Sequence, residues 1–141
     1  MANIAFSALC NGHDSTGVPD LISYQQTLAT AGAAWDGVST FVVPPTAPEN
    51  GLYYFSIEFV NDAYNNGGTS NDVWVQLERT IGGTAEVLIA AWAAQGAKRT
   101  TGAASTILPL KRGSQIRTRA HSANGERRNI AQVTFSGFLI A

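Results

Sequence analysis

The sequence predicts an all-β domain, an antiparallel sandwich of short strands. Segments in which apolar and polar residues alternate recur along the chain, and turn residues such as Gly, Pro and Asn separate them. No segment carries an apolar stripe with the 3.6-residue period of a helix. Short strands that repeat every 8–15 residues or so, about the spacing of sandwich folds, indicate this architecture.

Nine strands are expected. They span residues 4–10, 22–29, 38–43, 51–60, 73–79, 85–93, 104–110, 114–120 and 131–140. The clearest is 51–60, where an apolar row of side chains should face the core and a second row should face away from it. The inward row is Tyr53, Phe55, Ile57 and Phe59, and the outward row is Tyr54, Ser56 and Glu58.

Two further segments need interpretation. The Ala-rich segment 85–93 has a composition that favours helix, but its larger side chains fit a strand buried on both faces. Residues 61–72 are too polar and Gly-rich for regular structure. We expect them to form an exposed loop of the kind that carries binding, with Asn65 and Asn66 as candidate partner-binding residues.

Length and composition indicate a single domain over residues 1–141 with one core. Only 13% of the residues are charged, which leaves neutral surface available for burial against other chains. There is no signal-peptide pattern and no membrane-spanning apolar run, so we expect a cytoplasmic origin and no membrane partner. The single cysteine, Cys10, is expected to be a buried strand thiol.

The charge distribution is uneven along the chain. Residues 1–86 carry nine acidic residues against Arg79, and residues 87–141 carry eight basic residues against Glu126. Acidic and basic strands that neutralise each other side by side would explain this. Alternatively, a basic rim that includes Arg127 and Arg128 meets an acidic surface or another subunit. Nucleic acid is not expected as a partner, because aromatic residues do not interleave with the basic ones.

Five separate elements share order and spacing with a known family. They lie in "IAFSA" at 4–8, "AAWDGVSTFVVPPTAPENGLYYFSIEF" at 33–59, "LPLKRGSQI" at 108–116 and "TFSGFLIA" at 134–141. Together they resemble the globular head of complement C1q and, more distantly, the tumour necrosis factor fold. The chain departs from the family pattern at Ser114, where the family has a turn aspartate.

The resemblance implies a jelly roll of about ten strands that trimerises around a threefold axis. It implies that the outward row of strand 51–60 and the end of strand 131–140 face neighbouring subunits. The implied interface residues are Tyr54, Ser56, Glu58, Phe138 and Ile140. No recognisable calcium-loop spacing is present, so we expect neither a metal nor a cofactor.

We expect no enzymatic activity. His13 and His121 lie in sequence contexts that lack a nucleophile elbow, and no P-loop, CxxC or HExxH motif occurs. Trp74 alternates with apolar residues and shares a strand face with Gln76 and Glu78, so it is either a sugar-stacking platform or an interface anchor.

The resulting hypothesis is a non-enzymatic homotrimeric structural protein, in particular a bacteriophage virion component such as a capsid decoration (cement) protein, assembled in the host cytoplasm. Its partners would then be capsid or tail proteins. The alternative is a saccharide- or receptor-binding recognition module of a phage appendage or bacterial surface, with Trp74 in the binding surface.

Overall fold

The computed structural model describes residues 3–15, 20–61, 73–93, 100–122 and 128–141. These residues form eleven strands and no helix. The strands are β1 (Ala5–Cys10), β2 (His13–Ser15), β3 (Asp20–Leu21), β4 (Gln26–Ala31), β5 (Thr40–Val42), β6 (Asn50–Asn61), β7 (Val73–Ile81), β8 (Thr84–Ala93), β9 (Thr100–Lys111), β10 (Gln115–Ser122) and β11 (Arg128–Leu139).

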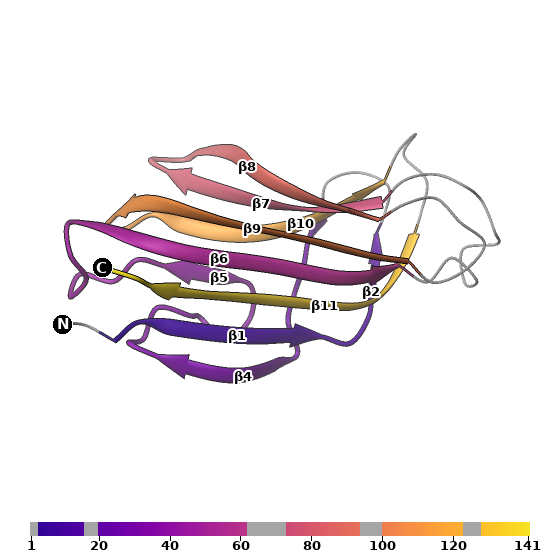
Figure 1. The fold of residues 1–141 in the computed structure, drawn as a ribbon, viewed down its shortest axis with the longest axis horizontal. Helices are drawn as coiled ribbons and strands as arrows, with labels where there is room; N and C mark the ends of the chain where they lie inside the picture. The colour runs from indigo at the N-terminus through magenta and orange to yellow at the C-terminus, as the bar shows by residue number, and fades with distance from the viewer. Residues whose placement is uncertain (1–2, 16–19, 62–72, 94–99, 123–127) are drawn as a thin grey trace.

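The strands form two antiparallel sheets that pack face to face (Figure 1). The six-stranded sheet has the order β4-β1-β11-β6-β9, and β2 pairs with β11. The five-stranded sheet has the order β3-β10-β7-β8, and β5 pairs with β10. The predicted all-β antiparallel sandwich is therefore confirmed.

Aromatic side chains fill the space between the sheets. Phe6 lies at the centre, with its ring stacked on Trp35 at a centroid distance of 4.7 Å and in edge contact with Phe135 at 4.7 Å. The predicted inward row of β6 is fully buried, so its orientation is confirmed. Trp35 belongs to this core, and its indole Nε1 donates to Thr27 Oγ1 at 3.1 Å.

Two strand predictions need correction. Of the expected strand 22–29, only residues 26–29 form a strand, as part of β4. Residues 22–25 connect β3 to β4, which belong to different sheets, so the chain crosses from one sheet to the other here. Ile22 and Tyr24 lie in this crossing and are buried, and their apolar alternation imitates a strand. The short strand β2 was not expected.

The segment 85–93 is a strand, as predicted, but the prediction that both of its faces are buried is wrong. β8 lies at the edge of its sheet, and Val87 and Trp92 remain 55% and 54% exposed. A register shift between Leu77 and Glu78 of the neighbouring strand adds an irregularity to this pairing. Residues 62–72 of the expected binding loop lie outside the described residues.

Gly137 of β11 leaves room for the rings of Phe6 and Phe55, its neighbours on the two flanking strands of the same sheet. A Cβ atom at this position would lie 2.5 Å from Phe55 Cδ1 and 2.9 Å from Phe6 Cε1. Both rings belong to the packed aromatic core, so neither has free space to move into. The glycine of the "TFSGFLIA" segment is thus required by core volume.

Asp36 organises the turn before β5. Its Oδ1 accepts hydrogen bonds from the backbone N–H groups of Val38, Ser39 and Thr40 at 2.8, 2.9 and 3.1 Å. Burial alone would raise the pKa of Asp36, but these donors and Arg117 hold the pKa below its usual range. The carboxylate therefore stabilises the turn in its ionised form.

Replacing Gly137 with Ala should lower the free energy of unfolding by about 1–3 kcal/mol, because the added methyl group overpacks the core. Urea denaturation followed by circular dichroism measures this loss. Gln132→Ala on the exposed side of the same strand is the matched control and should change little. Equal stability of the two variants would contradict the packing role of Gly137.

Asp36→Asn should lower the melting temperature by a few degrees near neutral pH while keeping the acceptor oxygen in place. Because the folded pKa of Asp36 is depressed, its stabilisation is present above the unfolded pKa of about 3.9 and is lost as the pH falls through the folded value. The difference in melting temperature between wild type and variant should therefore shrink below about pH 4. A difference that stays constant down to low pH would show that the charge contributes nothing.

Candidate functional site

The outward face of the six-stranded sheet is the candidate site. Antiparallel pairing of β1, β11, β6 and β9 aligns its outward side chains in rows that run across the strands. The rows are Ala5, Phe138, Tyr54 and Ile107 in the first, Ser7, Ser136, Ser56 and Ser105 in the second, and Leu9, Thr134, Glu58 and Ala103 in the third. Along the strands, the outward face thus changes from an apolar row, through a row of serine hydroxyls, to a row that contains a carboxylate.

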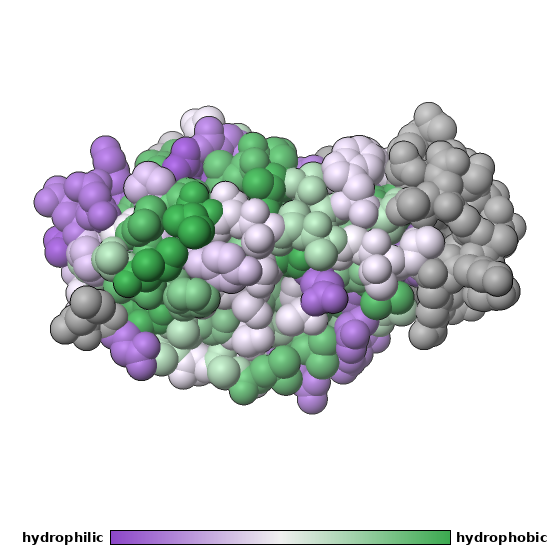
Figure 2. Space-filling view, viewed as in Figure 1, coloured by the Kyte–Doolittle hydropathy of each residue, from purple (hydrophilic) through white to green (hydrophobic). Residues whose placement is uncertain are grey.

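An apolar ridge marks one end of this face. We define the ridge as Leu52, Tyr54, Ile107, Phe138 and Ile140. Figure 2 shows hydrophobic surface gathered over the ends of β6, β9 and β11. The rings of Tyr54 and Phe138 are 5.1 Å apart, while Phe138 and Ile107 remain 45% and 59% exposed. A contiguous exposed apolar patch of this kind is typical of a contact surface.

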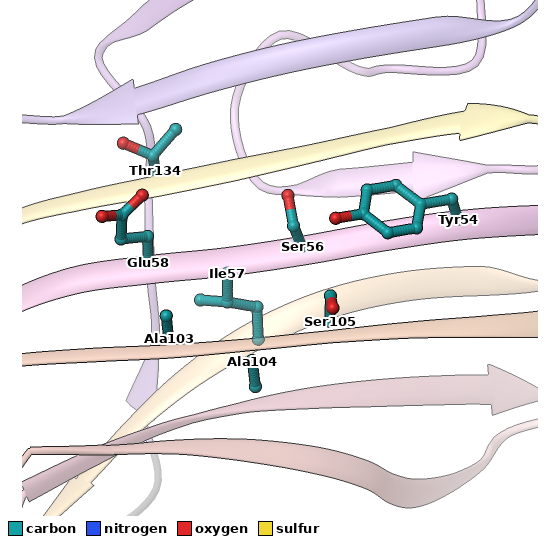
Figure 3. A pocket seen from close by; sticks show the side chains of 8 residues that line it. All are labelled: Tyr54, Ser56, Ile57, Glu58, Ala103, Ala104, Ser105 and Thr134. Atoms are coloured by element: carbon teal, nitrogen blue, oxygen red, sulfur yellow. The ribbon is translucent and has the colours of Figure 1, made fainter.

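A hollow of about 390 Å³ lies beside the ridge. Figure 3 shows the Tyr54 ring directed along β6 toward Ser56, with Glu58 and Thr134 near each other farther along the strands. Small side chains, Ala103 and Ser105, form the β9 side of the hollow and leave it open. Glu58 is the only charged residue in the three rows.

All five predicted interface residues are on or beside this face. Tyr54, Ser56, Glu58 and Phe138 belong to the rows, and the backbone N–H of Ile140 donates to the carbonyl oxygen of Leu52 at 2.7 Å. Sequence reasoning missed Leu52 and Ile107. Leu52 continues the alternation of Tyr54 and Ser56, so the pattern contained a signal for it. Ile107 is placed beside Tyr54 only by the β6–β9 register, which has no local signal.

Trp74 lies on the opposite side of the molecule from this face, on the outward face of the five-stranded sheet. Its ring is stacked between Trp92, at a centroid distance of 4.3 Å, and His121, at 4.2 Å. Both faces of Trp74 are covered, so the exposed ring of this group is that of Trp92. The sequence reading did not single out Trp92 as a site residue.

The remaining candidate residues cannot be placed. Asn65, Asn66 and Arg127 lie outside the described residues. Arg128 begins β11, but its side chain is likewise outside the described part. The proposed basic rim therefore stays a prediction.

Some of the uneven charge is neutralised between adjacent strands. Arg119 Nε donates to Glu78 Oε2 at 2.7 Å across the β10–β7 pair, and Arg79 pairs with Glu86 across β7 and β8. These contacts agree with the local-neutralisation interpretation for the five-stranded sheet. Arg112 contacts the backbone instead of a carboxylate, since its Nε donates to the carbonyl oxygen of Ala47 at 2.6 Å.

The described residues supply few side chains arranged for metal binding or catalysis. Among them, no three His, Cys, Asp or Glu side chains lie close enough together to hold a metal ion. His13 Nε2 of β2 lies 2.8 Å from Asp20 Oδ2 of β3, and neither residue belongs to the rows of the outward face. Over the same part of the chain, no helix has the length and apolar character to cross a membrane. What this face does offer is an exposed apolar ridge beside an open hollow, features that protein–protein contact surfaces commonly share.

Comparisons with known proteins agree with the two-sheet fold. The globular domain of zebrafish complement 1qA protein is similar in structure, with a TM-score of 0.70, 18% identity and coverage of 98% of each chain. Murine APRIL at pH 5.0 has a TM-score of 0.70, 13% identity and coverage of 99% of each chain. Eiger TNF from S. frugiperda has a TM-score of 0.61 and 13% identity, covering 100% of this chain and 94% of its own.

A comparison with curated protein sequences finds no match. The family model of the C1q domain, in contrast, matches residues 5–140. Since that match spans nearly the whole sequence, and the two-sheet fold agrees with it, this chain belongs to the C1q domain family.

Proposed function

We propose that this chain is a non-enzymatic structural protein that acts as a homotrimer through the outward face of its six-stranded sheet. The supporting observation is the exposed apolar ridge beside an open hollow on that face. C1q/TNF-like domains typically form trimers, which gives the ridge a defined occupant, a second copy of this chain.

The energetics of the ridge favour this occupant. Fully burying one large apolar side chain contributes about 1.5–3 kcal/mol, and the ridge carries several that are only partly covered. A threefold ring is closed by heterologous contacts, so the ridge of each subunit meets a different surface of the next. One substitution in the ridge is therefore repeated in all three interfaces.

The more specific proposal is a bacteriophage virion component, in particular a capsid decoration protein. A trimer has the symmetry of the threefold and quasi-threefold positions of an icosahedral shell. The low content of charged residues, 13%, leaves neutral surface for contact with shell proteins. In this role the trimer would connect neighbouring capsid subunits, after assembly in the host cytoplasm.

A second candidate function is recognition of a saccharide on a bacterial or virion surface. The observation that favours it is the aromatic group on the five-stranded sheet, in which the Trp92 ring is held against Trp74 yet stays more than half exposed. An exposed indole face is suited to the apolar side of a sugar ring. This function is compatible with the trimer, because it uses the other sheet.

Phe138→Glu should convert the trimer to a monomer, because it places three like charges in apolar contacts at once. Native mass spectrometry at micromolar concentration measures the change, and circular dichroism checks that the fold is kept. Ile81→Glu, also at an exposed apolar position but on the other sheet, is the control and should stay trimeric. A wild-type chain that is monomeric under these conditions would refute the assembly.

Purified virions of the encoding bacteriophage should carry the trimer at threefold or quasi-threefold positions, which cryo-electron microscopy would reveal. Stripping the protein should lower the temperature at which the capsid opens, and adding back the wild type should restore it, while Phe138→Glu should not. Capsid stability that does not depend on the protein would argue against the cement role. Virions that lack the chain would rule out the virion location.

A further inference from the structure

Three rings form a continuous stack on the outward face of the five-stranded sheet. The register places Trp74 of β7 directly opposite Trp92 of β8 on one side and His121 of β10 on the other. The interplanar angles are 26° for the Trp92 pair and 11° for the His121 pair. We call this group the ring stack. It lies outside the core, on a face that no described strand covers.

A chain of hydrogen bonds holds the ring stack in place. Trp74 Nε1 donates to Gln76 Oε1 at 3.2 Å, and Gln76 Nε2 donates to Glu78 Oε1 at 2.9 Å. Glu78 Oε2 in turn accepts from Arg119 Nε at 2.7 Å. Gln76 and Glu78 are only 8% exposed, so these contacts are sheltered from water. The central ring is therefore ordered before any ligand arrives, which lowers the entropic cost of binding.

His121 is fixed independently. Its Nδ1 lies 2.9 Å from the carbonyl oxygen of Ser122, and a carbonyl can only accept, so Nδ1 carries the proton. The remaining ring nitrogen, Nε2, is then an acceptor in the neutral ring. His121 closes one side of Trp74, which leaves Trp92 as the terminal ring of the stack.

Trp92 presents an open ring face at the edge of the sheet. β8 is the last strand of its sheet, so the face of Trp92 that does not touch Trp74 has no further strand beside it in that sheet. Its backbone is held close to β9, where a Cβ on Gly102 would lie 2.6 Å from the Trp92 carbonyl oxygen. A fixed backbone and one stacked face make the outer indole surface a rigid platform.

The charges beside the platform favour a neutral ligand. Glu78 is the carboxylate nearest the stack along β7, and it is already engaged by Arg119 and Gln76. It is therefore not available to support a cationic ligand over the ring, which weakens the case for a quaternary ammonium group. The negative face of the indole attracts weakly positive C–H groups, such as those on one side of a pyranose ring.

We infer that a neutral saccharide binds at Trp92, with the C–H face of one sugar ring stacked on the outer indole surface. Trp74 and His121 act as positioning residues, because their stacked rings fix the orientation of the Trp92 ring. This inference rests on the second proposed function, recognition of a saccharide, and it specifies the ligand as a neutral sugar and the contact as the outer face of the Trp92 ring. The contact area is one sugar ring, so the affinity of a single site is low and is measured on the intact chain with oligosaccharides in excess.

The test is a binding screen of the wild-type protein against neutral oligosaccharides built from glucose, galactose, mannose and N-acetylglucosamine, followed by titration of those that bind. Trp92→Ala should weaken binding about tenfold or more, because it removes the stacking surface. Trp92→Phe, which keeps a smaller ring, should bind with an affinity between those of the wild type and Trp92→Ala. Val87→Ala is the matched control, since Val87 is equally exposed on the same strand, and it should bind like wild type.

Other results would overturn the inference in distinguishable ways. Saccharide binding that Trp92→Ala leaves unchanged would keep the recognition function but refute the site. Absence of binding to every oligosaccharide in the screen would refute both. Dissociation of the trimer by Trp92→Ala, seen by native mass spectrometry, would assign Trp92 to a subunit contact. Tighter binding of single-stranded oligothymidine or choline than of any saccharide would assign the platform to another ligand class.

Discussion

The two-residue alternation of β6 is the constraint on which the rest of the structure depends. β6 lies between β11 and β9, and its inward row packs into the aromatic core around Phe6. A slip of one residue would move four large apolar side chains out of the core and put Glu58 into it. The strand therefore has one allowed register. That register also fixes the outward positions of Tyr54, Ser56 and Glu58, so the core determines the geometry of the outward face.

Local patterns in the sequence were sufficient for the fold class and for the inward and outward rows of β6. The resemblance to the C1q and tumour necrosis factor group supplied the topology, which alternation alone does not contain. Contacts between strands distant in sequence were not predictable, because they depend on the register of pairing. Ile107 meets Tyr54 only through such a pairing. Trp92 meets Trp74 across the consecutive strands β7 and β8, where the register shift between Leu77 and Glu78 has no signal in the alternation. The crossing at Ile22 was misread since a buried connection has the same apolar spacing as a strand.

The two outward faces differ in how many of their polar and aromatic groups have partners within the same sheet. On the five-stranded sheet, Glu78 pairs with Arg119 and Trp74 is covered on both sides, so most polar and aromatic groups already have partners within the sheet. On the six-stranded sheet, the ridge leaves Phe138 and Ile107 exposed beside an open hollow. Val87 and Trp92 nevertheless remain exposed on the first face. The second gains free energy when another chain covers it.

This difference separates assembly from recognition. In the proposed trimer, each ridge would lie in a subunit contact, and the ridge and Trp92 lie on different sheets. One trimer would then carry three copies of Trp92. Stacking on a single indole supports only a weak interaction, but three linked sites raise the effective concentration for a second and third contact with a repetitive surface. In this chain, trimerisation through one sheet is therefore what would make a shallow aromatic platform on the other sheet useful for binding.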